Sequence, residues 1–148
     1  MNIYNLHTNP EQLKYYNDDK TKIPYFALKK AMRMKQHPGN DLTDLEHTIA
    51  KEAEPSLTYA NKVIRGRFPE GEPAILSAGI AESLRYFGRQ FDYEVHWPEL
   101  AEIILQNGTP RQARNYAENM TTRWPEAEEL IKQDKGEWRI YQNWMQHI

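Results

Sequence analysis

The chain of 148 residues contains no cysteine and only three serines. The lack of cysteine excludes disulfides, thiolate metal sites and a cysteine nucleophile. The sequence also lacks a Gly-x-Ser-x-Gly motif and a glycine-rich phosphate loop, and its five histidines form no His-Glu-x-x-His motif. We therefore expect no catalytic residue, no bound metal and no cofactor, and we predict that the protein is not an enzyme.

Long apolar runs and a strong net charge are missing as well. No stretch approaches the ~20 apolar residues that a membrane-spanning helix needs. The first residues, MNIYNLHTNPEQLKYY, lack the basic start and apolar centre of a secretion signal. A formal net charge of −2 argues against coating nucleic acid by bulk charge. We expect no membrane partner and a location inside the cell. The length favours a single domain over residues 1–148.

Strand signals are sparse, whereas helix start and stop signals are frequent. Asn9 and Pro10 are typical of a helix start. Pro24 predicts the start of a second helix, which His37-Pro38-Gly39 would end. Asp41 and Asp44 have the spacing of a capping residue and its N3 acid at the start of a third. We interpret residues 1–53 as an N-terminal helical cap that includes a degenerate repeat.

A repeat of about 28 residues organises residues 54–148. An aromatic residue returns with this period in segments that predict long helices, near 55–66, 80–93, 110–121 and 137–147. We expect these aromatic residues to take equivalent core positions: Tyr59, Phe87, Tyr116 and Trp144. Trp138 and Tyr141 fall outside this register, so we expect them to cap the end of the repeat stack.

A second phrase, aromatic-Pro-Glu, lies between the long helices. Its aromatic and proline residues are Phe68-Pro69, Trp97-Pro98 and Trp124-Pro125. Proline fixes φ in the first turn of a helix, and the acidic residues beside it complement the helix dipole. We predict short helices here, each held by its preceding aromatic residue. Thr109 and Gln112 predict a capping box. Three glycines should close the units, the last two in the left-handed conformation: Gly79, Gly108 and Gly136.

These patterns predict an all-α fold. We expect a short, solenoid-like stack of about four αα-hairpin repeats on the N-terminal helical cap, because a lone hairpin cannot bury its apolar face.

The segments YANKVIRGRFPEGEPAIL and RNYAENMTTRWPEAEELI resemble a tandem helical repeat of bacteriophage proteins, with the typical form YARDVIKGRWPEAEPII. The middle copy departs from this pattern, with two extra residues before Trp97-Pro98-Glu99 and with His96 where the other copies have arginine. The resemblance implies a phage origin and the cytoplasm of an infected bacterial host. The family has no known function, so no functional residue is transferred from it.

Three functions remain open. The first is a non-enzymatic phage protein that binds a host or phage protein through its repeat surface, to inhibit or redirect it. The second is nucleic-acid binding through a basic row on the repeat face, in which Arg85 and Arg114 share a repeat position. The third is a structural or assembly component of the virion. The candidate binding residues are Lys62, Arg65, Arg67, Arg85, Arg89 and Arg114. Against the second function, Arg67 and Arg123 would instead pair with nearby glutamates.

Overall fold

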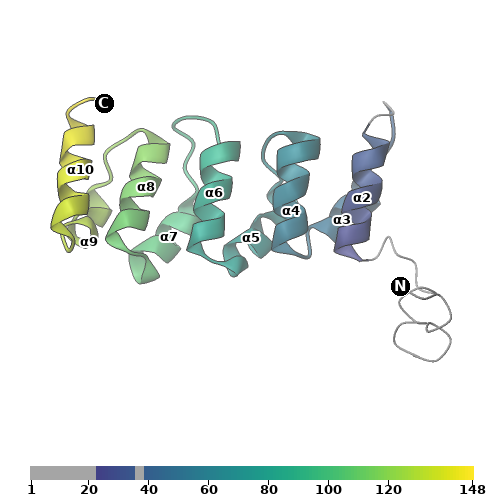
Figure 1. Cartoon of the computed structure of the whole chain (residues 1–148), viewed down its shortest axis with the longest axis horizontal. Coiled ribbons are helices and arrows are strands. Elements are labelled where there is room, and N and C mark those ends of the chain that lie inside the picture. The colour runs from purple at the N-terminus through teal and green to yellow at the C-terminus, as the bar shows by residue number, and fades with distance from the viewer. Residues whose placement is uncertain (1–22, 36–38) are drawn as a thin grey trace, which may run out of the picture. The chain divides into compact units, whose positions relative to one another are not determined.

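The computed structural model describes residues 23–35 and 39–148, and every regular element within these ranges is a helix (Figure 1). The predicted all-α class is confirmed. The chain divides into two compact units, Met1–Ala74 and Ile75–Ile148, which we describe one at a time. The prediction of a single domain stays a prediction. The helix start at Asn9 and the stop at His37-Pro38 lie outside the described residues.

The first unit is built around one pair of helices and the turns that follow. Its described elements, in chain order, are α2 (Pro24–Met34), α3 (Thr43–Ile49), α4 (Ala53–Tyr59), the π-helical turn η3 (Ala60–Ile64), the 3-10 turn η4 (Pro69–Gly71) and the start of α5 (Glu72–Ala78). Helix α2 packs against α3 and α4. It begins at Pro24, as predicted, and buries Ala27, Leu28 and Ala31.

The predicted capping box at Asp41 and Asp44 is wrong. Oδ1 of Asp41 instead accepts hydrogen bonds from the backbone N–H and the hydroxyl of Thr43, the residue at which α3 begins. A short acidic side chain readily binds the backbone two residues ahead, and this local bond takes the place of the cap.

The second unit has two layers (Figure 1). Its elements after α5 are α6 (Ile80–Gln90), α7 (Pro98–Asn107), α8 (Pro110–Met120), the 3-10 turn η5 (Pro125–Ala127), α9 (Glu128–Ile131) and α10 (Lys135–Met145). Helices α6, α8 and α10 follow one another in contact, while α7 touches α6 and α8, and α9 touches α8 and α10. The helices predicted near 80–93, 110–121 and 137–147 are confirmed. The capping box of Thr109 and Gln112 forms as predicted.

The predicted register of the aromatic residues needs a correction. The large side chains that are fully buried at corresponding places are four tyrosines: Tyr59, Tyr86, Tyr116 and Tyr141. Phe87 is also buried, but it stacks on Tyr116 of the next long helix, with ring centroids 4.8 Å apart. Tyr141 therefore belongs to the core and does not cap it, while Trp144 is only half-buried. Each of the four tyrosines is the seventh residue of its helix, which fixes this register.

The glycines also differ from expectation. Gly108 follows α7 with φ −80°, which is not left-handed, and Gly136 lies inside α10. Gly108 is required for another reason, because a Cβ there would stand 2.6 Å from the carbonyl oxygen of Ile104. Gly79, before α6, has φ 132°, a conformation that favours glycine.

Candidate binding groove

Three segments of eight residues lead into the short helices with the same local geometry. We call residues 65–72, 94–101 and 121–128 the entry segments; each has its proline at the fifth position. Their first residues, Arg65, Glu94 and Thr121, are the non-glycine residues with positive φ in the described chain, at 57°, 69° and 57°. At Arg65 and Thr121 the left-handed residue caps the preceding helical turn and redirects the chain, whereas Glu94 lies four residues beyond Gln90, where α6 ends.

The fourth residue of each entry segment is the aromatic residue before proline. Its φ and ψ are −121° and 80° at Phe68, −119° and 84° at Trp97, and −124° and 80° at Trp124. All three side chains are buried. The residue before proline therefore has the same conformation in the three segments, although the turn that follows differs: Pro69–Gly71 and Pro125–Ala127 form 3-10 turns, whereas α7 begins directly at Pro98.

An ion pair spans two of the entry segments. Nη2 of Arg67 lies 2.7 Å from Oε1 of Glu72, and Nη2 of Arg123 lies 2.8 Å from Oε1 of Glu128. In each pair the arginine Nε donates to the other carboxylate oxygen, so both contacts are bidentate. Arg123 holds the pKa of the Glu128 carboxyl below its usual range. The alternative reading of Arg67 and Arg123 as partners of nearby glutamates is confirmed.

The middle entry segment lacks both members of this pair. Its third residue is His96 and its eighth is Ala101, where the other segments have arginine and glutamate. The connection before it is also longer, as the sequence suggested, and it exposes Tyr93 and Val95. All of these departures fall within residues 92–101.

The hydrogen bonds made by the tyrosine hydroxyls differ between the last and the middle entry segment. The backbone N–H of Trp124 donates to the hydroxyl of Tyr141 (2.9 Å), which donates in turn to Oε2 of Glu128 (3.1 Å). The backbone N–H of Trp97 donates in the same way to Tyr116 (3.0 Å). With alanine at 101, the Tyr116 hydroxyl donates to the carbonyl of Trp97 instead (3.3 Å). Each buried hydroxyl therefore keeps a partner.

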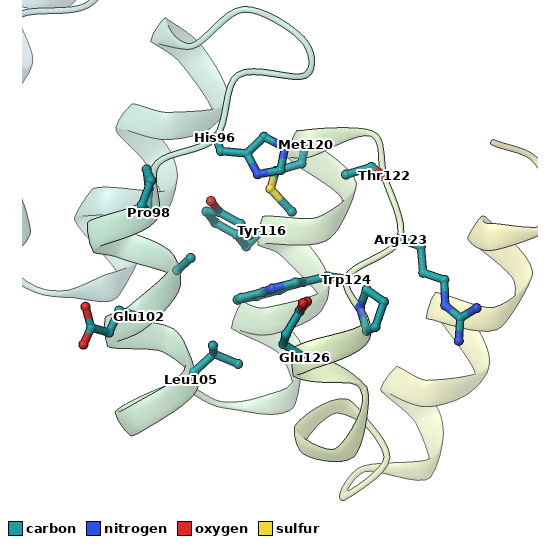
Figure 2. A pocket seen from close by; sticks show the side chains of 12 residues that line it. His96, Pro98, Glu102, Leu105, Tyr116, Met120, Thr122, Arg123, Trp124 and Glu126 are labelled. Atoms are coloured by element: carbon teal, nitrogen blue, oxygen red, sulfur yellow. The ribbon is translucent and has the colours of Figure 1, made fainter.

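A groove of about 570 Å³ opens beside Tyr116, between α7 and residues 122–126 (Figure 2). His96 and Ala101 line it, so the groove lies where the middle entry segment lacks its ion pair. The other lining residues are mainly apolar or aromatic: Pro98, Leu105, Tyr116, Met120, Trp124 and Pro125, with Glu102, Thr122, Arg123 and Glu126 at the edges. This volume lies within the ~300–1,000 Å³ typical of ligand sites.

The charges around the groove are mainly negative. The Arg123 side chain turns away from the groove (Figure 2), and its charge is neutralised by Glu128. Glu102 and Glu126 belong to opposite walls, and neither forms an ion pair within the described part of the chain. The groove thus combines aromatic lining residues with two carboxylates that form no ion pair among the described residues, of which Glu102 accepts a hydrogen bond from Gln106.

The residues of the predicted basic row differ in exposure and in ion pairing, and they do not all form one row. Arg67 binds Glu72, and Arg114 lies between Glu118 and Glu137 with only 12% of its side chain exposed. Arg85 and Arg114 do not share a position: Gly79 directly precedes α6, whereas Thr109 separates Gly108 from α8. Arg85 therefore lies directly before the buried Tyr86, whereas Arg114 lies two residues before the buried Tyr116. Lys62, Arg65, Arg85 and Arg89 are exposed.

Sequence reasoning found His96 but not Ala101, and it did not find the groove. The signal was available, because aligning the three segments on their prolines sets His96-Ala101 against two Arg-Glu pairs.

Within residues 23–35 and 39–148, no three His, Asp or Glu side chains are grouped so that they could hold a metal ion. Among the same residues, no helix has the length and apolar character needed to cross a bilayer. Comparison with protein-family models, with curated proteins and with solved structures finds no match to this chain. The resemblance to the phage repeat stays a prediction.

Proposed function

We propose that this chain is a non-enzymatic binding protein that engages a partner protein through the groove face of its second unit. One observation carries the proposal. The three entry segments share a left-handed first residue and the conformation of the residue before proline, and the one that lacks the common ion pair is the one that lines an open groove. A departure that serves no evident purpose in packing is expected at a functional site.

We further infer that the helical hairpins form a short stacked array. The recurring entry segments support this inference, as does the outer face of α10. On α6, the residues after Tyr86 face α8: Phe87 stacks on Tyr116, and Gly88 lies against Asn119. On α10, the corresponding Gln142 and Asn143 are polar and exposed. A polar outer face is what a terminal repeat needs to stay in solution.

Following the sequence resemblance, we propose that the partner is a host or phage protein in the cytoplasm of an infected bacterium. Binding would inhibit or redirect that partner. Affinity capture of the tagged protein from bacterial lysate tests this function, with one half of the lysate treated with nuclease. We expect a stoichiometric protein that survives nuclease. Capture that disappears with nuclease, or no capture from infected and uninfected cells, would contradict the proposal.

Nucleic-acid binding is the second candidate, and one observation favours it. Arg85 and Arg111 line a shallow groove of about 450 Å³ between α6 and α8, together with Gln112 and Asn115. Neither arginine forms an ion pair within the described residues. Guanidinium and amide groups in one groove suit a phosphate backbone. This candidate predicts an affinity for single-stranded DNA or RNA that falls steeply with salt.

A further inference from the structure

The groove beside Tyr116 is the space that an arginine-glutamate pair would fill. In the last entry segment, Glu128 receives the Tyr141 hydroxyl and Arg123 covers that carboxylate. The corresponding side chains in the middle segment are His96, which is exposed, and Ala101, which is too short to reach the Tyr116 hydroxyl. The residue before proline has the same φ and ψ in both segments, but α7 begins directly at Pro98, whereas the last segment first forms a 3-10 turn at Pro125–Ala127. The groove therefore lies where two short side chains stand in place of the ion pair, beside a first helical turn that also differs.

Its chemistry suits a positively charged side chain. The rings of Trp124 and Tyr116, 4.7 Å apart between centroids, line the groove (Figure 2). Aromatic rings attract ammonium and guanidinium groups, and carboxylates bind them through charge-assisted hydrogen bonds. Glu126 supplies a carboxylate beside Trp124, whereas Glu102 on the other wall points away from the rings and accepts a hydrogen bond from Gln106 at 3.4 Å (Figure 2). Leu105, whose side chain is 43% exposed, adds an apolar contact at one end.

We propose that the groove binds a protein segment that presents a lysine or arginine beside a large apolar side chain. The partner's cation takes the place of the missing internal arginine, with its stem over Trp124 and its charge on Glu126, which lies beside that ring (Figure 2). The apolar side chain packs on Leu105. This inference rests on the proposed function and names the class of partner that its groove recognises.

A closure variant tests the proposal directly. His96→Arg together with Ala101→Glu restores the pair that the other entry segments contain. The variant should fold with unchanged or higher thermal stability, because the residue before proline already has the conformation found in the two paired segments. Its new side chains would fill the groove next to Tyr116. A matched control, His147→Arg together with Gln142→Glu, introduces the same two residues five positions apart at exposed positions, Gln142 in α10 and His147 just after its end.

The probe is a library of random short peptides displayed on yeast and sorted against the full-length protein. We expect the enriched peptides to contain lysine or arginine next to an aromatic or large aliphatic residue. Synthetic versions should bind the closure variant at least about tenfold more weakly, as expected when a central contact is blocked. They should bind the control variant like the wild type. Glu126→Lys should weaken binding as well, whereas Glu129→Lys, outside the groove, should not.

Three results would overturn this assignment: no enrichment over the closure variant, enrichment of acidic or uncharged peptides, or equal binding to wild type and closure variant. The lysate capture separates this failure from that of the proposed function. If a nuclease-resistant partner is captured equally by the wild type and the closure variant, protein binding stands and the groove is not its site. If the closure variant alone loses that partner, the groove is the site.

Discussion

The hydroxyl of Tyr141 joins the buried backbone N–H of Trp124 to the carboxylate of Glu128, with hydrogen bonds of 2.9 and 3.1 Å. One side chain on α10 thus connects the start of a short helix to the ion pair that spans it. Tyr116 makes the corresponding bond to the N–H of Trp97 but has no carboxylate to reach. The hydroxyl of Tyr59 has a carboxylate partner, because it donates to Oε2 of Glu46 at 2.9 Å.

Removing the hydroxyl of Tyr141 should therefore destabilise the fold. Tyr141→Phe leaves the buried Trp124 N–H without its acceptor and removes one donor from Glu128, which keeps its two bonds from Arg123, so we expect a loss of about 1–2 kcal/mol. Tyr116→Phe should cost about 1 kcal/mol, and Tyr59→Phe less, because the Glu46 carboxylate retains access to water. Urea denaturation of the three variants measures the order. Equal losses at the three positions would contradict the roles assigned to these hydroxyls.

The left-handed residues give a prediction of opposite sign. Thr121 has φ 57°, and a β-branched residue is strained in this conformation. Asparagine tolerates it well, so Thr121→Asn should stabilise the protein by about 0.5–1 kcal/mol. The neighbouring Thr122 has no positive φ, and Thr122→Asn is the control, expected to change stability little. Thermal unfolding should show a higher midpoint for Thr121→Asn alone.

The pair of Arg123 and Glu128 should make stability depend on pH in the acid range. The pKa of Glu128 is lowered in the fold, so its carboxylate stabilises the native state above the ordinary pKa of 4.5. That contribution disappears as the pH falls through the lowered, folded-state pKa. Glu128→Gln should cost about 1–2 kcal/mol at pH 7, and the difference from wild type should shrink progressively below pH 4.5.

The control for this titration is Glu129→Gln. The Glu129 side chain is 88% exposed, and its one ion pair among the described residues joins its Oε1 to Nζ of Lys132 at 3.2 Å. Its effect should stay below about 0.5 kcal/mol throughout the pH range. A Glu128→Gln difference that is independent of pH would mean that ionisation of this carboxyl does not contribute to stability.

Much of the fold could be predicted because its signals are local. Proline at the first turn placed α2, α7 and α8 correctly, and Thr109 with Gln112 gave the observed capping box. Glu72 and Glu128 follow Arg67 and Arg123 by five residues, which is close enough in the sequence for ion pairs to be predicted. These features depend on contacts within a few residues, which a sequence shows directly.

The register and the groove depend on tertiary contacts and could not be obtained in the same way. Successive helical residues differ by about 100° around the axis, so a period of about 28 residues cannot decide between Tyr86 and Phe87. The decision comes from the folded structure, in which Tyr86, like Tyr59, Tyr116 and Tyr141, is the seventh residue of its helix. The groove, likewise, is the space left by two short side chains, His96 and Ala101, which lie five positions apart.

Arginine substitutions should distinguish the arginines that stabilise the fold from those that would bind nucleic acid. Arg114, in α8, forms ion pairs with Glu118 of the same helix and with Glu137 of α10. Replacing Arg114 with glutamine leaves these two carboxylates close together, so we expect the free energy of unfolding to fall by about 1–2 kcal/mol.

Arg85 is exposed and free of ion pairs among described residues, so Arg85→Gln should change stability by less than about 0.5 kcal/mol. The informative variant for nucleic acid is therefore Arg85→Glu with Arg111→Glu, in which the internal ion pairs are intact. If wild type binds a fluorescent oligonucleotide and this variant retains that affinity at low salt, the groove between α6 and α8 does not contact phosphate.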